Sequence, residues 1–495
     1  MHTAFKSLLV LQYVLCEGLV RAQSSGTASA TACASTIAPR NAAPSVAPGW
    51  QANVVANNLE DPRGMIFDNR GGLLVVQQEK GIVRLRFNSE GGACVRQEGS
   101  TEVVIDNPAL NHGIELSDDG RTLYASSADG VFAWDYDAST GRNTSGPRLV
   151  VGQMGGDDGH VSRTLVLSRK TPGMLLVSRG SQSNLDMAAL DVSTGVSTIK
   201  AFNITGRSNS TNGNASSYSF AQDGVLLGWG LRNSVGVAEE PVTGGIYSVE
   251  NSVDDIERNG RTFNQNNPGE ELNFHGYLNG TQFADQGRNY GYPTCFAAWG
   301  VNEIPNNNGL QVGAQFAIGQ QNATVNDTYC REGTVAPRLT FAAHMAPLDI
   351  KFNPNGTAAW VSMHGSWNRD QPIGYKLSIV AFNGAGSPTA PATSNSSYTD
   401  IVSNPDLSKC PDQCFRPVGL AWDSQGRLYF SSDSTGEIYV VTRADGSRVS
   451  AANGTANGTN ADSQSSGQGS SVASVGVSVS AFAAVWAGIM ALSLL

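Results

Sequence analysis

The chain has 495 residues, of which only 15% are charged, and its formal net charge is −10. A net-acidic chain of this kind argues against nucleic acid or an anionic membrane surface as its partner. The 56 glycines suit a fold with many tight turns between short strands.

Residues 1–22 have the pattern of a secretory signal peptide. Lys6 places a positive charge before an apolar stretch that reaches Leu15, and Ala22 ends a small-residue cleavage motif. A buried N-terminal helix is the alternative, which the short apolar stretch disfavours. Residues 23–45 are small, polar and rich in proline, so we expect an N-terminal arm ahead of a folded body at 46–449.

One short phrase recurs six times along this body: a polar head, a few apolar residues, a turn and a strand. The heads are Arg63, His112, His160, Arg232 with Asn233, His344 and Arg416. Recurrence of this kind indicates a repeat architecture, in which each copy builds one structural unit. We therefore predict an all-β, six-bladed β-propeller with a long insertion between 232 and 345, in its second half. The alternatives are a two-sheet sandwich or a blade number that differs by one.

Equivalent positions of the repeats should meet at one rim of a central channel. Arginines and histidines gathered there in a net-acidic chain indicate a small polyanionic ligand, because the planar guanidinium fork matches carboxylates. His160 is the best candidate for a general base, since imidazole titrates near neutral pH. Asp157 and Asp158 could orient its ring or raise its basicity. His112 is the competing base, and Asn111 and His112 could equally bind substrate.

Two further segments carry candidate chemistry. The turn from Glu250 to Asp255 offers hard oxygen ligands that suit Ca²⁺, although acidic turns are common and the spacing is not that of an EF-hand. The string His364-Gly-Ser-Trp-Asn-Arg369 follows a predicted strand and indicates a recognition loop, in which Trp367 could also pack a blade junction. The chain lacks the glycine-rich and serine-elbow motifs of nicotinamide enzymes and serine hydrolases.

The cysteines and the asparagine motifs agree with export. Once Cys16 leaves with the signal peptide an even set remains, for which we predict the disulfides Cys33–Cys94, Cys295–Cys330 and Cys410–Cys414. Glycosylation motifs occur at Asn143, Asn203, Asn209, Asn214, Asn279, Asn322, Asn326, Asn355, Asn395, Asn453 and Asn457. The sequence therefore predicts a secreted glycoprotein.

The C-terminal end has the pattern of a GPI-anchor signal. Residues 450–474 are a spacer rich in serine, glycine and asparagine, and residues 475–495 are an apolar tail without lysine or arginine. A membrane-spanning helix usually carries basic residues on its cytoplasmic side, so a plain tail anchor is the weaker alternative. We expect a protein that reaches the membrane only through this anchor.

Taken in order, the motifs resemble those of the quinoprotein sugar dehydrogenases, which include soluble glucose dehydrogenase and the sorbosone dehydrogenase-like proteins. The likeness spans about residues 50–445 and is greatest to the fungal pyranose dehydrogenases of auxiliary activity family 12. The segments that carry it are Gly159-His160, Arg163-Thr-Leu165, Ser178–Ser181 with Asn184 and Asp186, Leu231-Arg-Asn233, Glu250–Asp255, Gly287–Pro293, His364–Arg369 and Phe415–Gly419.

This resemblance implies a propeller that holds pyrroloquinoline quinone (PQQ) and Ca²⁺ and oxidises pyranoses at the anomeric carbon. His160 matches the family's general base, and Arg232 matches a position beside the reactive carbonyl. The positions that match cofactor contacts are Arg232, Asn233, His364, Arg369 and Arg416. Ser252 and Val253 fall where backbone carbonyls bind the calcium. Asn111, His112 and Trp367 are the candidates for sugar contacts.

The resemblance also implies the partners: a monosaccharide, and an external electron acceptor such as a copper polysaccharide oxygenase or a cytochrome. We expect a monomer that binds no nucleic acid. The alternative activity is a calcium-dependent propeller lactonase, which would need carboxylate and amide ligands on several blades and no arginine cluster. A non-catalytic adhesion propeller is the third hypothesis. The arginine-rich rim favours the dehydrogenase.

Overall fold

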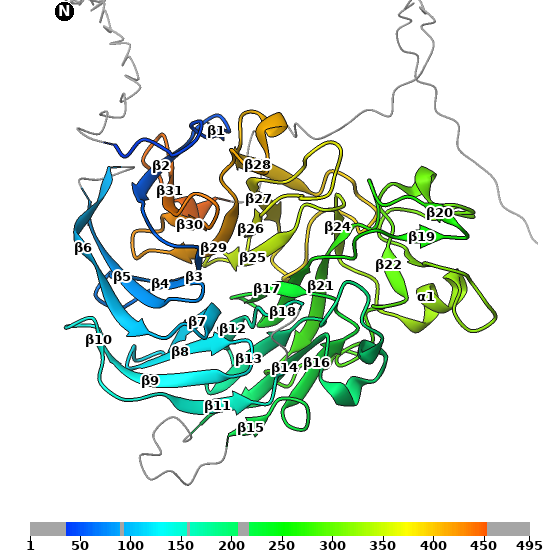
Figure 1. Ribbon diagram of the computed structural model, residues 1–495, viewed down its shortest axis with the longest axis horizontal. Helices are drawn as coiled ribbons and strands as arrows, with labels where there is room; N and C mark the ends of the chain where they lie inside the picture. The colour runs from blue at the N-terminus through cyan, green and yellow to red at the C-terminus, as the bar shows by residue number, and fades with distance from the viewer. Residues whose placement is uncertain (1–35, 90–93, 156–158, 206–216, 453–495) are drawn as a thin grey trace, which may run out of the picture. The chain divides into compact units, whose positions relative to one another are not determined.

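The computed structural model describes residues 36–89, 94–155, 159–205 and 217–452 (Figure 1). The predicted signal peptide, the first part of the arm, nearly all of the spacer and the predicted anchor tail lie outside these residues. Within the described ranges, no helix has both the length and the apolar character needed to cross a bilayer.

Six sheets with four antiparallel strands each form the blades of the folded body, and the first strand of each contains one head of the repeated phrase or begins just after it. The first blade contains β3 (Pro62–Phe67), β4 (Leu73–Gln77), β5 (Gly81–Ser89) and β6 (Val95–Asp106), and the second contains β7 (Leu110–Leu116), β8 (Thr122–Ser127), β9 (Val131–Asp137) and β11 (Arg148–Gly152). The third contains β12 (Leu165–Leu167), β13 (Met174–Arg179), β14 (Thr198–Asn203) and β16 (Val225–Trp229), and the fourth contains β17 (Ser234–Glu239), β18 (Gly245–Glu250), β21 (Glu270–Tyr277) and β24 (Leu339–Phe341). The fifth contains β25 (Pro347–Phe352), β26 (Ala358–Met363), β27 (Lys376–Ala381) and β28 (Tyr398–Ser403), and the last contains β29 (Pro417–Trp422), β30 (Leu428–Ser432), β31 (Glu437–Arg443) and β2 (Trp50–Ala56). Short strands extend three of them: β1 (Ser45–Val46) pairs with β28, β10 (Arg142–Asn143) with β9, and β15 (Tyr218–Ser219) with β11.

The first strands of the six sheets form a closed ring. Each of β3, β7, β12, β17 and β25 contacts the first strand of the next sheet, and β29 returns to β3. The last sheet is completed by a strand from near the N-terminus, because β2 pairs with β31 (Figure 1). The pairing is antiparallel, with Trp50 opposite Arg443. The predicted six-bladed β-propeller is therefore confirmed.

The blades bury both of their faces against their neighbours. Leu73, Leu74, Val75 and Val76 of β4 have no exposed surface, because alternate side chains enter the cores on either side. A strand buried on both faces is a continuous apolar run rather than an alternating one. This explains the unbroken apolar runs that follow each turn in the repeated phrase.

Serine hydroxyls on second strands tie neighbouring blades together at the ring. Ser126 accepts a hydrogen bond from the Gly113 amide of its own blade and donates to the Arg163 carbonyl of the next, at 2.6 Å. Ser431 likewise accepts from Gly419 and donates to the Arg63 carbonyl, at 2.8 Å, across the closing joint of the ring. We refer to Ser126, Ser362 and Ser431 as the ring serines, since Ser362 donates to the Val418 carbonyl of the following blade in the same way.

The predicted long insertion lies in the fourth blade, on both sides of β21. Its elements are β19 (Glu257–Arg258), β20 (Arg261–Thr262), β22 (Cys295–Ala297), the 3-10 turn Val301–Glu303, β23 (Gln315–Ala317) and α1 (Asp327–Gly333). Further short 3-10 turns lie elsewhere in the described chain, at Met187–Leu190, Val192–Thr194, Leu407–Lys409 and Val449–Ala451. The Arg258 guanidinium is buried and binds the Asp327 carboxylate at 2.7 Å, which ties the β19–β20 hairpin to α1.

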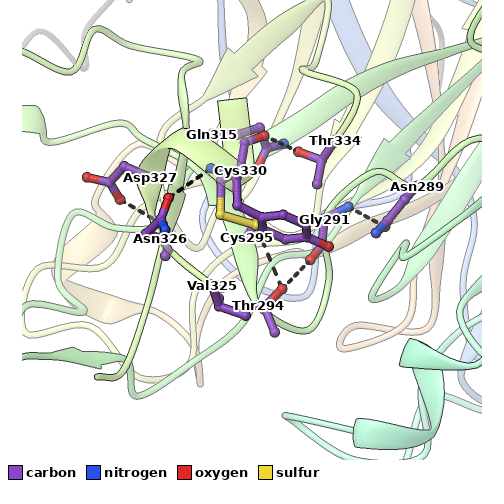
Figure 2. The surroundings of a disulfide bond; sticks show 12 residues. Asn289, Gly291, Thr294, Cys295, Gln315, Val325, Asn326, Asp327, Cys330 and Thr334 are labelled. Carbon is purple, nitrogen blue, oxygen red and sulfur yellow. Dashed lines mark hydrogen bonds between the residues drawn. A yellow bond between two sulfur atoms is a disulfide. The ribbon is translucent and has the colours of Figure 1, made fainter. Parts of the chain in front are cut away.

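Two of the three predicted disulfides are confirmed. Cys295 on β22 is bonded to Cys330 on α1, next to Thr294 and Thr334 (Figure 2). Cys410 is bonded to Cys414 in the short loop before β29. Cys94 is also disulfide-bonded, and its predicted partner Cys33 lies outside the described residues.

Candidate functional site

The heads of the repeated phrase lie where the first strands begin. Arg63 and His112 fall inside β3 and β7, while His160, Arg232, His344 and Arg416 come shortly before β12, β17, β25 and β29. Of the six, His160 is hydrogen-bonded to Ser181, and the Nδ1 of His112 has no partner among the described residues. The side chains of the other four belong to two hydrogen-bonded groups, Arg232 and His344 around Asp254 and Arg63 and Arg416 around Asp433. We call these the Asp254 group and the Asp433 group.

His160 is held in one orientation by Ser181. Its Nδ1 lies 2.9 Å from the Ser181 hydroxyl oxygen and 3.1 Å from the Ser181 carbonyl oxygen. The Ser181 hydroxyl donates its own hydrogen to the Ser183 carbonyl, at 2.7 Å, so both oxygens facing Nδ1 are acceptors. Nδ1 must then carry the hydrogen, which leaves the lone pair on Nε2.

The environment of His160 keeps its ring neutral. Burial, and then the positive charge of Arg232, lower its pKa to about 4. This is opposite to the expected rise in basicity from Asp157 and Asp158, which themselves lie outside the described residues. The buried Arg163 supports the same loop, since its guanidinium donates to the His160 carbonyl at 2.7 Å.

The Asp254 group begins with Arg232, whose side chain is buried. Its guanidinium donates to the Asp254 carboxylate at 3.2 Å and to the Asn184 side-chain oxygen at 2.9 Å. Asn184 in turn donates to the Asp254 carbonyl at 2.7 Å. Tyr292, from the insertion, also holds Asn184 in place, because its hydroxyl donates to the Asn184 carbonyl. Asn233 lies beside His160: a Cβ added to Gly180 would come within 3 Å of both side chains.

His344 joins the Asp254 group from the fifth blade. Its Nδ1 lies 3.2 Å from the Asp254 carboxylate and its Nε2 lies 2.5 Å from the Asn264 carbonyl. Burial lowers its pKa, but the hydrogen bond to Asp254 and the charge of Glu270 outweigh that effect and raise it overall. The pKa of Asp254 is lowered, because its hydrogen bond to His344 and the charge of Arg232 outweigh the effect of burial.

The backbone between Asn251 and Asp254 presents unused oxygen atoms. The Ser252 amide donates to the buried Glu270 carboxylate at 2.6 Å, and the Arg232 guanidinium donates to the Asn251 carbonyl. Among the described residues, nothing donates to the carbonyl oxygens of Ser252 and Val253. Nor do three or more His, Cys, Asp or Glu side chains gather there or elsewhere in the described ranges in a way that could hold a metal ion. A hard cation here would rely on these carbonyls.

The Asp433 group gathers three of the remaining cationic or imidazole side chains. The Asp433 carboxylate binds Arg63 at 2.7 Å and His364 at 3.0 Å, and their charges hold its pKa well below the usual value despite burial. Arg416 donates to the carbonyls of His364 at 3.2 Å and Gly365 at 2.7 Å. Within the described part of the chain, these two hydrogen bonds use the Nε and Nη2 atoms of Arg416, and its Nη1 atom makes none. It is available to an anionic ligand.

The loop from His364 to Arg369 connects the two groups. His364 binds Asp433, while Asn368 donates to the Asp254 carboxylate at 2.9 Å. Trp367 is 67% exposed, so it does not pack a blade junction. Arg369 donates to the Ala343 carbonyl and to the Asn266 side chain, and so anchors the loop to the fourth-blade insertion.

Asn111 and His112 are buried on β7 and keep unused polar atoms. Asn111 donates to the Val161 carbonyl at 2.9 Å, while its side-chain oxygen and the Nδ1 of His112 have no partner within the described residues. Burial and the nearby Arg63 lower the pKa of His112 well below its ordinary value. His112 is therefore neutral, and it lies deeper than His160.

Several residues of these groups were not singled out by sequence reasoning as site residues: Ser181, Asn184, Asp254, Glu270, Asn368 and Asp433. Most of them lie within the motifs on which the family resemblance rests, but those motifs did not indicate which contacts these residues make. Asp433 is different, because it follows β30 in an ordinary Ser-Ser-Asp-Ser turn and meets Arg63 from 370 positions away. No local pattern marks it.

The fold and these two groups together define a six-bladed propeller whose first strands carry a cation- and imidazole-rich site at their beginnings. A family model described as TrAA12-like matches residues 44–444, and the chain belongs to this family. The prediction of an auxiliary activity family 12 relative is thus confirmed.

Two curated relatives support this assignment. The chain is 46% identical over 405 residues to the pyrroloquinoline quinone-dependent sugar dehydrogenase of Hypocrea jecorina (strain QM6a), a match that covers 81% of this chain and 90% of that protein. It is 36% identical over 417 residues to the pyrroloquinoline quinone-dependent pyranose dehydrogenase of Coprinopsis cinerea, again over 81% of this chain. The second match spans only 55% of the Coprinopsis protein.

Solved structures agree with the fold. A calcium structure of a Trichoderma reesei protein of carbohydrate-active enzyme family AA12 is 45% identical, with a TM-score of 0.79, and the match covers 83% of this chain and 100% of that one. The holo form of the pyranose dehydrogenase PQQ domain from Coprinopsis cinerea is 35% identical, with a TM-score of 0.75, over 83% of this chain and 99% of that one.

Proposed function

We propose that this protein is a PQQ- and calcium-dependent dehydrogenase that oxidises pyranose sugars at the anomeric carbon. Its relatives' names support PQQ and a sugar substrate. The observation that carries the proposal is the arrangement of the two groups, with the neutral base His160 beside Arg232 and with Arg416 keeping a free donor. When bound, PQQ supplies a quinone that accepts two electrons from the sugar.

The residues present fit an anion with several carboxylates. Arg416 would hold one carboxylate through Nη1. Its Nε and Nη2 atoms already donate to the carbonyls of residues 364 and 365, so the guanidinium is fixed in position before the carboxylate binds. Arg232 and Asn233 would lie at the reactive end, beside His160. His364 and Arg369 would complete the contacts from the loop that joins the two groups.

The donor set also fits a calcium ion. Ser252 and Val253 would supply their free carbonyl oxygens, which are hard ligands of the kind that Ca²⁺ prefers. Glu270 holds the Ser252 peptide through its amide and the Ala346 amide through the other carboxylate oxygen, at 2.6 and 3.2 Å. The Asp254 amide, which belongs to the same peptide group as the Val253 carbonyl, donates to the Asn184 side-chain oxygen at 2.9 Å and fixes the orientation of that carbonyl.

His160 would take the proton of the sugar's anomeric hydroxyl on Nε2 as the C–H bond gives up its electrons. Two features prepare it for this role. Ser181 keeps the hydrogen on Nδ1, and burial keeps the ring neutral and able to accept a proton at any pH well above 4. The neighbouring Arg232 would favour negative charge that develops on the substrate oxygen.

The sugar would be bound between this base and the exposed Trp367, whose ring offers an apolar face to a pyranose. Asn111 and His112 are buried, so we assign them to the inner floor of the site, with their unused polar atoms available to a substrate hydroxyl. We keep His112 as the competing base.

The test is to add PQQ and Ca²⁺ to the purified protein and to follow dye reduction with L-fucose and other aldoses. We expect sugar-dependent reduction that needs both additions. Absence of PQQ binding at micromolar concentration would refute the proposal. His160→Ala should bind PQQ like the wild type and lose about 10²-fold or more in kcat, the usual size of a general-base contribution. If His160→Ala stays active, the base is His112.

Beyond the active site, we propose a secreted, glycosylated monomer held at the cell surface by a GPI anchor, which passes electrons to a separate acceptor protein such as a copper polysaccharide oxygenase or a cytochrome. The confirmed disulfides support an oxidising compartment. Treating intact cells with phosphatidylinositol-specific phospholipase tests the anchor: release of the protein is expected, and a tail-anchored protein would stay bound.

A further inference from the structure

The disulfide between Cys410 and Cys414 lies directly behind the Asp433 group. The two cysteines pack with the fully buried Tyr375 in one small apolar cluster, which Leu407 covers from outside. This cluster is separate from the larger cores between the blades. Its contacts therefore stabilise the segment just before Arg416, the candidate cofactor ligand two residues after Cys414.

Tyr375 transmits this packing to the ligand-binding atoms. The Arg416 guanidinium lies over its ring, 5.5 Å from the ring centre, and the Tyr375 hydroxyl donates to the Ser366 carbonyl. Gly365 packs so closely on the ring that an added Cβ would lie 2.5 Å from it. One aromatic ring thus supports both Arg416 and the backbone carbonyls that Arg416 binds.

A second contact reaches Asp433. The Cys414 carbonyl accepts a hydrogen bond from the Ser434 hydroxyl at 2.9 Å, next to the carboxylate that holds Arg63 and His364. The buried Asn404 completes the support, since its side chain donates to the carbonyls of both Tyr375 and Phe415, each at 2.9 Å. The disulfide loop, the ring and the anion-binding side chains form one continuous set of contacts.

We propose that the Cys410–Cys414 disulfide is a positioning element for the cofactor's carboxylates, and that it acts through Tyr375 on Arg416 and through Ser434 on the Asp433 group. This inference rests on the proposed function, because it takes the Asp433 group as the place where PQQ carboxylates bind. The disulfide closes a loop of only five residues, Cys410 to Cys414, and so joins no distant parts of the fold, but it can hold Tyr375 and Arg416 in one orientation.

The experiment compares two double variants, Cys410→Ser with Cys414→Ser and Cys295→Ser with Cys330→Ser. The second pair is the matched control, because its disulfide joins β22 to α1 within the insertion (Figure 2). PQQ affinity is measured by quenching of tryptophan fluorescence in excess Ca²⁺ and without sugar. We expect the first variant to raise the Kd for PQQ about tenfold, as expected when one desolvated cation–π contact is lost. The control should keep the wild-type Kd even where its urea midpoint falls.

Each outcome decides a different question. Equal PQQ affinity of the Cys410→Ser/Cys414→Ser variant and the wild type would overturn the inference, and so would an equal loss in the control. If the first variant does not fold, Tyr375→Leu removes the ring and leaves the disulfide in place; it should raise the Kd to a similar extent, and an unchanged Kd would overturn the inference. Failure of the wild type to bind PQQ would instead refute the proposed function.

Discussion

At the scale of single residues, orientation and protonation at this site are decided by neighbours rather than by the catalytic candidates themselves. The Ser181 hydroxyl is an acceptor toward His160 only because its hydrogen is engaged by the Ser183 carbonyl. Ser181 lies 21 positions after His160 in the sequence, and nothing in the sequence between them indicates that the two side chains meet. Their contact depends on the turn after β13, which no local pattern specifies.

Ser181→Ala should lower kcat about tenfold with little change in KM, because the loss of one net hydrogen bond loosens the imidazole without removing the base. The Ser181 carbonyl still accepts from Nδ1, so the loss should be far smaller than that of His160→Ala. Steady-state kinetics with a dye acceptor measures both. Ser183→Ala is the matched control, since its hydroxyl binds the Leu185 carbonyl and not the ring. Equal loss in both variants would contradict the role given to the Ser181 hydroxyl.

His275 makes the folded protein sensitive to acid. It is fully buried on β21, its Nε2 lies 2.8 Å from the Ser248 hydroxyl, and burial lowers its pKa to about 3. Between pH 6.5 and 3 the imidazole of His275 is protonated in the unfolded chain but stays neutral in the folded protein. The stabilising contribution is therefore fully present above pH about 6.5 and is lost as the pH falls toward 3.

His275→Gln should reduce this dependence. Between pH 4 and 6 the free energy of unfolding of the variant should fall less steeply than that of the wild type, by about 1.4 kcal/mol per pH unit, the value for one proton. Urea denaturation at several pH values gives the two slopes. Parallel slopes would show that His275 is already charged in the folded protein or is not buried.

At the scale of the strands and blades, the repeated phrase predicted the fold because each copy builds one blade. The apolar runs follow from burial on both faces, and the turn residues separate them, so blade number and the place of the insertion could be predicted from the sequence. The contacts between blades could not. A serine such as Ser431 is one of many in this chain, and its partner at Arg63 is brought to it only by closure of the ring.

Ser431→Ala should destabilise the protein by about 2 kcal/mol, because it leaves the Gly419 amide and the Arg63 carbonyl without a buried partner. Ser126→Ala should cost a similar amount at another joint of the ring. Chemical denaturation measures the changes. Ser447→Ala, at an exposed turn, is the control and should stay within about 0.5 kcal/mol of the wild type. Ring-serine variants as stable as this control would show that these ties contribute nothing.

At the scale of the whole folded body, closure depends on one strand from near the N-terminus. β2 supplies the fourth strand of the last blade, and its Trp50 packs edge-on against Trp360 of the fifth blade, with ring centres 5.3 Å apart, and under the Arg443 guanidinium. This single side chain packs β2 against the fifth blade as well as against the Arg443 side chain of its own blade.

Trp50→Ala should therefore lower the free energy of unfolding by about 3 to 5 kcal/mol, as for other buried aromatic residues. Trp367→Ala offers a matched comparison, because the same deletion at a side chain that is 67% exposed should change stability by about 0.5 kcal/mol or less. Urea titrations followed by far-ultraviolet circular dichroism distinguish the two. A small effect of Trp50→Ala would mean that the ring does not depend on this contact.

The pairing of β2 with β31 also has a consequence for how the chain can be rearranged. Because the two strands are antiparallel, with Trp50 opposite Arg443, the start of the first blade-forming strand and the end of the last lie side by side. The backbone at Gly49 already accepts a hydrogen bond from Ala444. A short linker could join these two positions and new ends could be opened in an exposed turn between blades. Such a circular permutant would retain every blade and both halves of the site, with the closing strand now continuous with its blade.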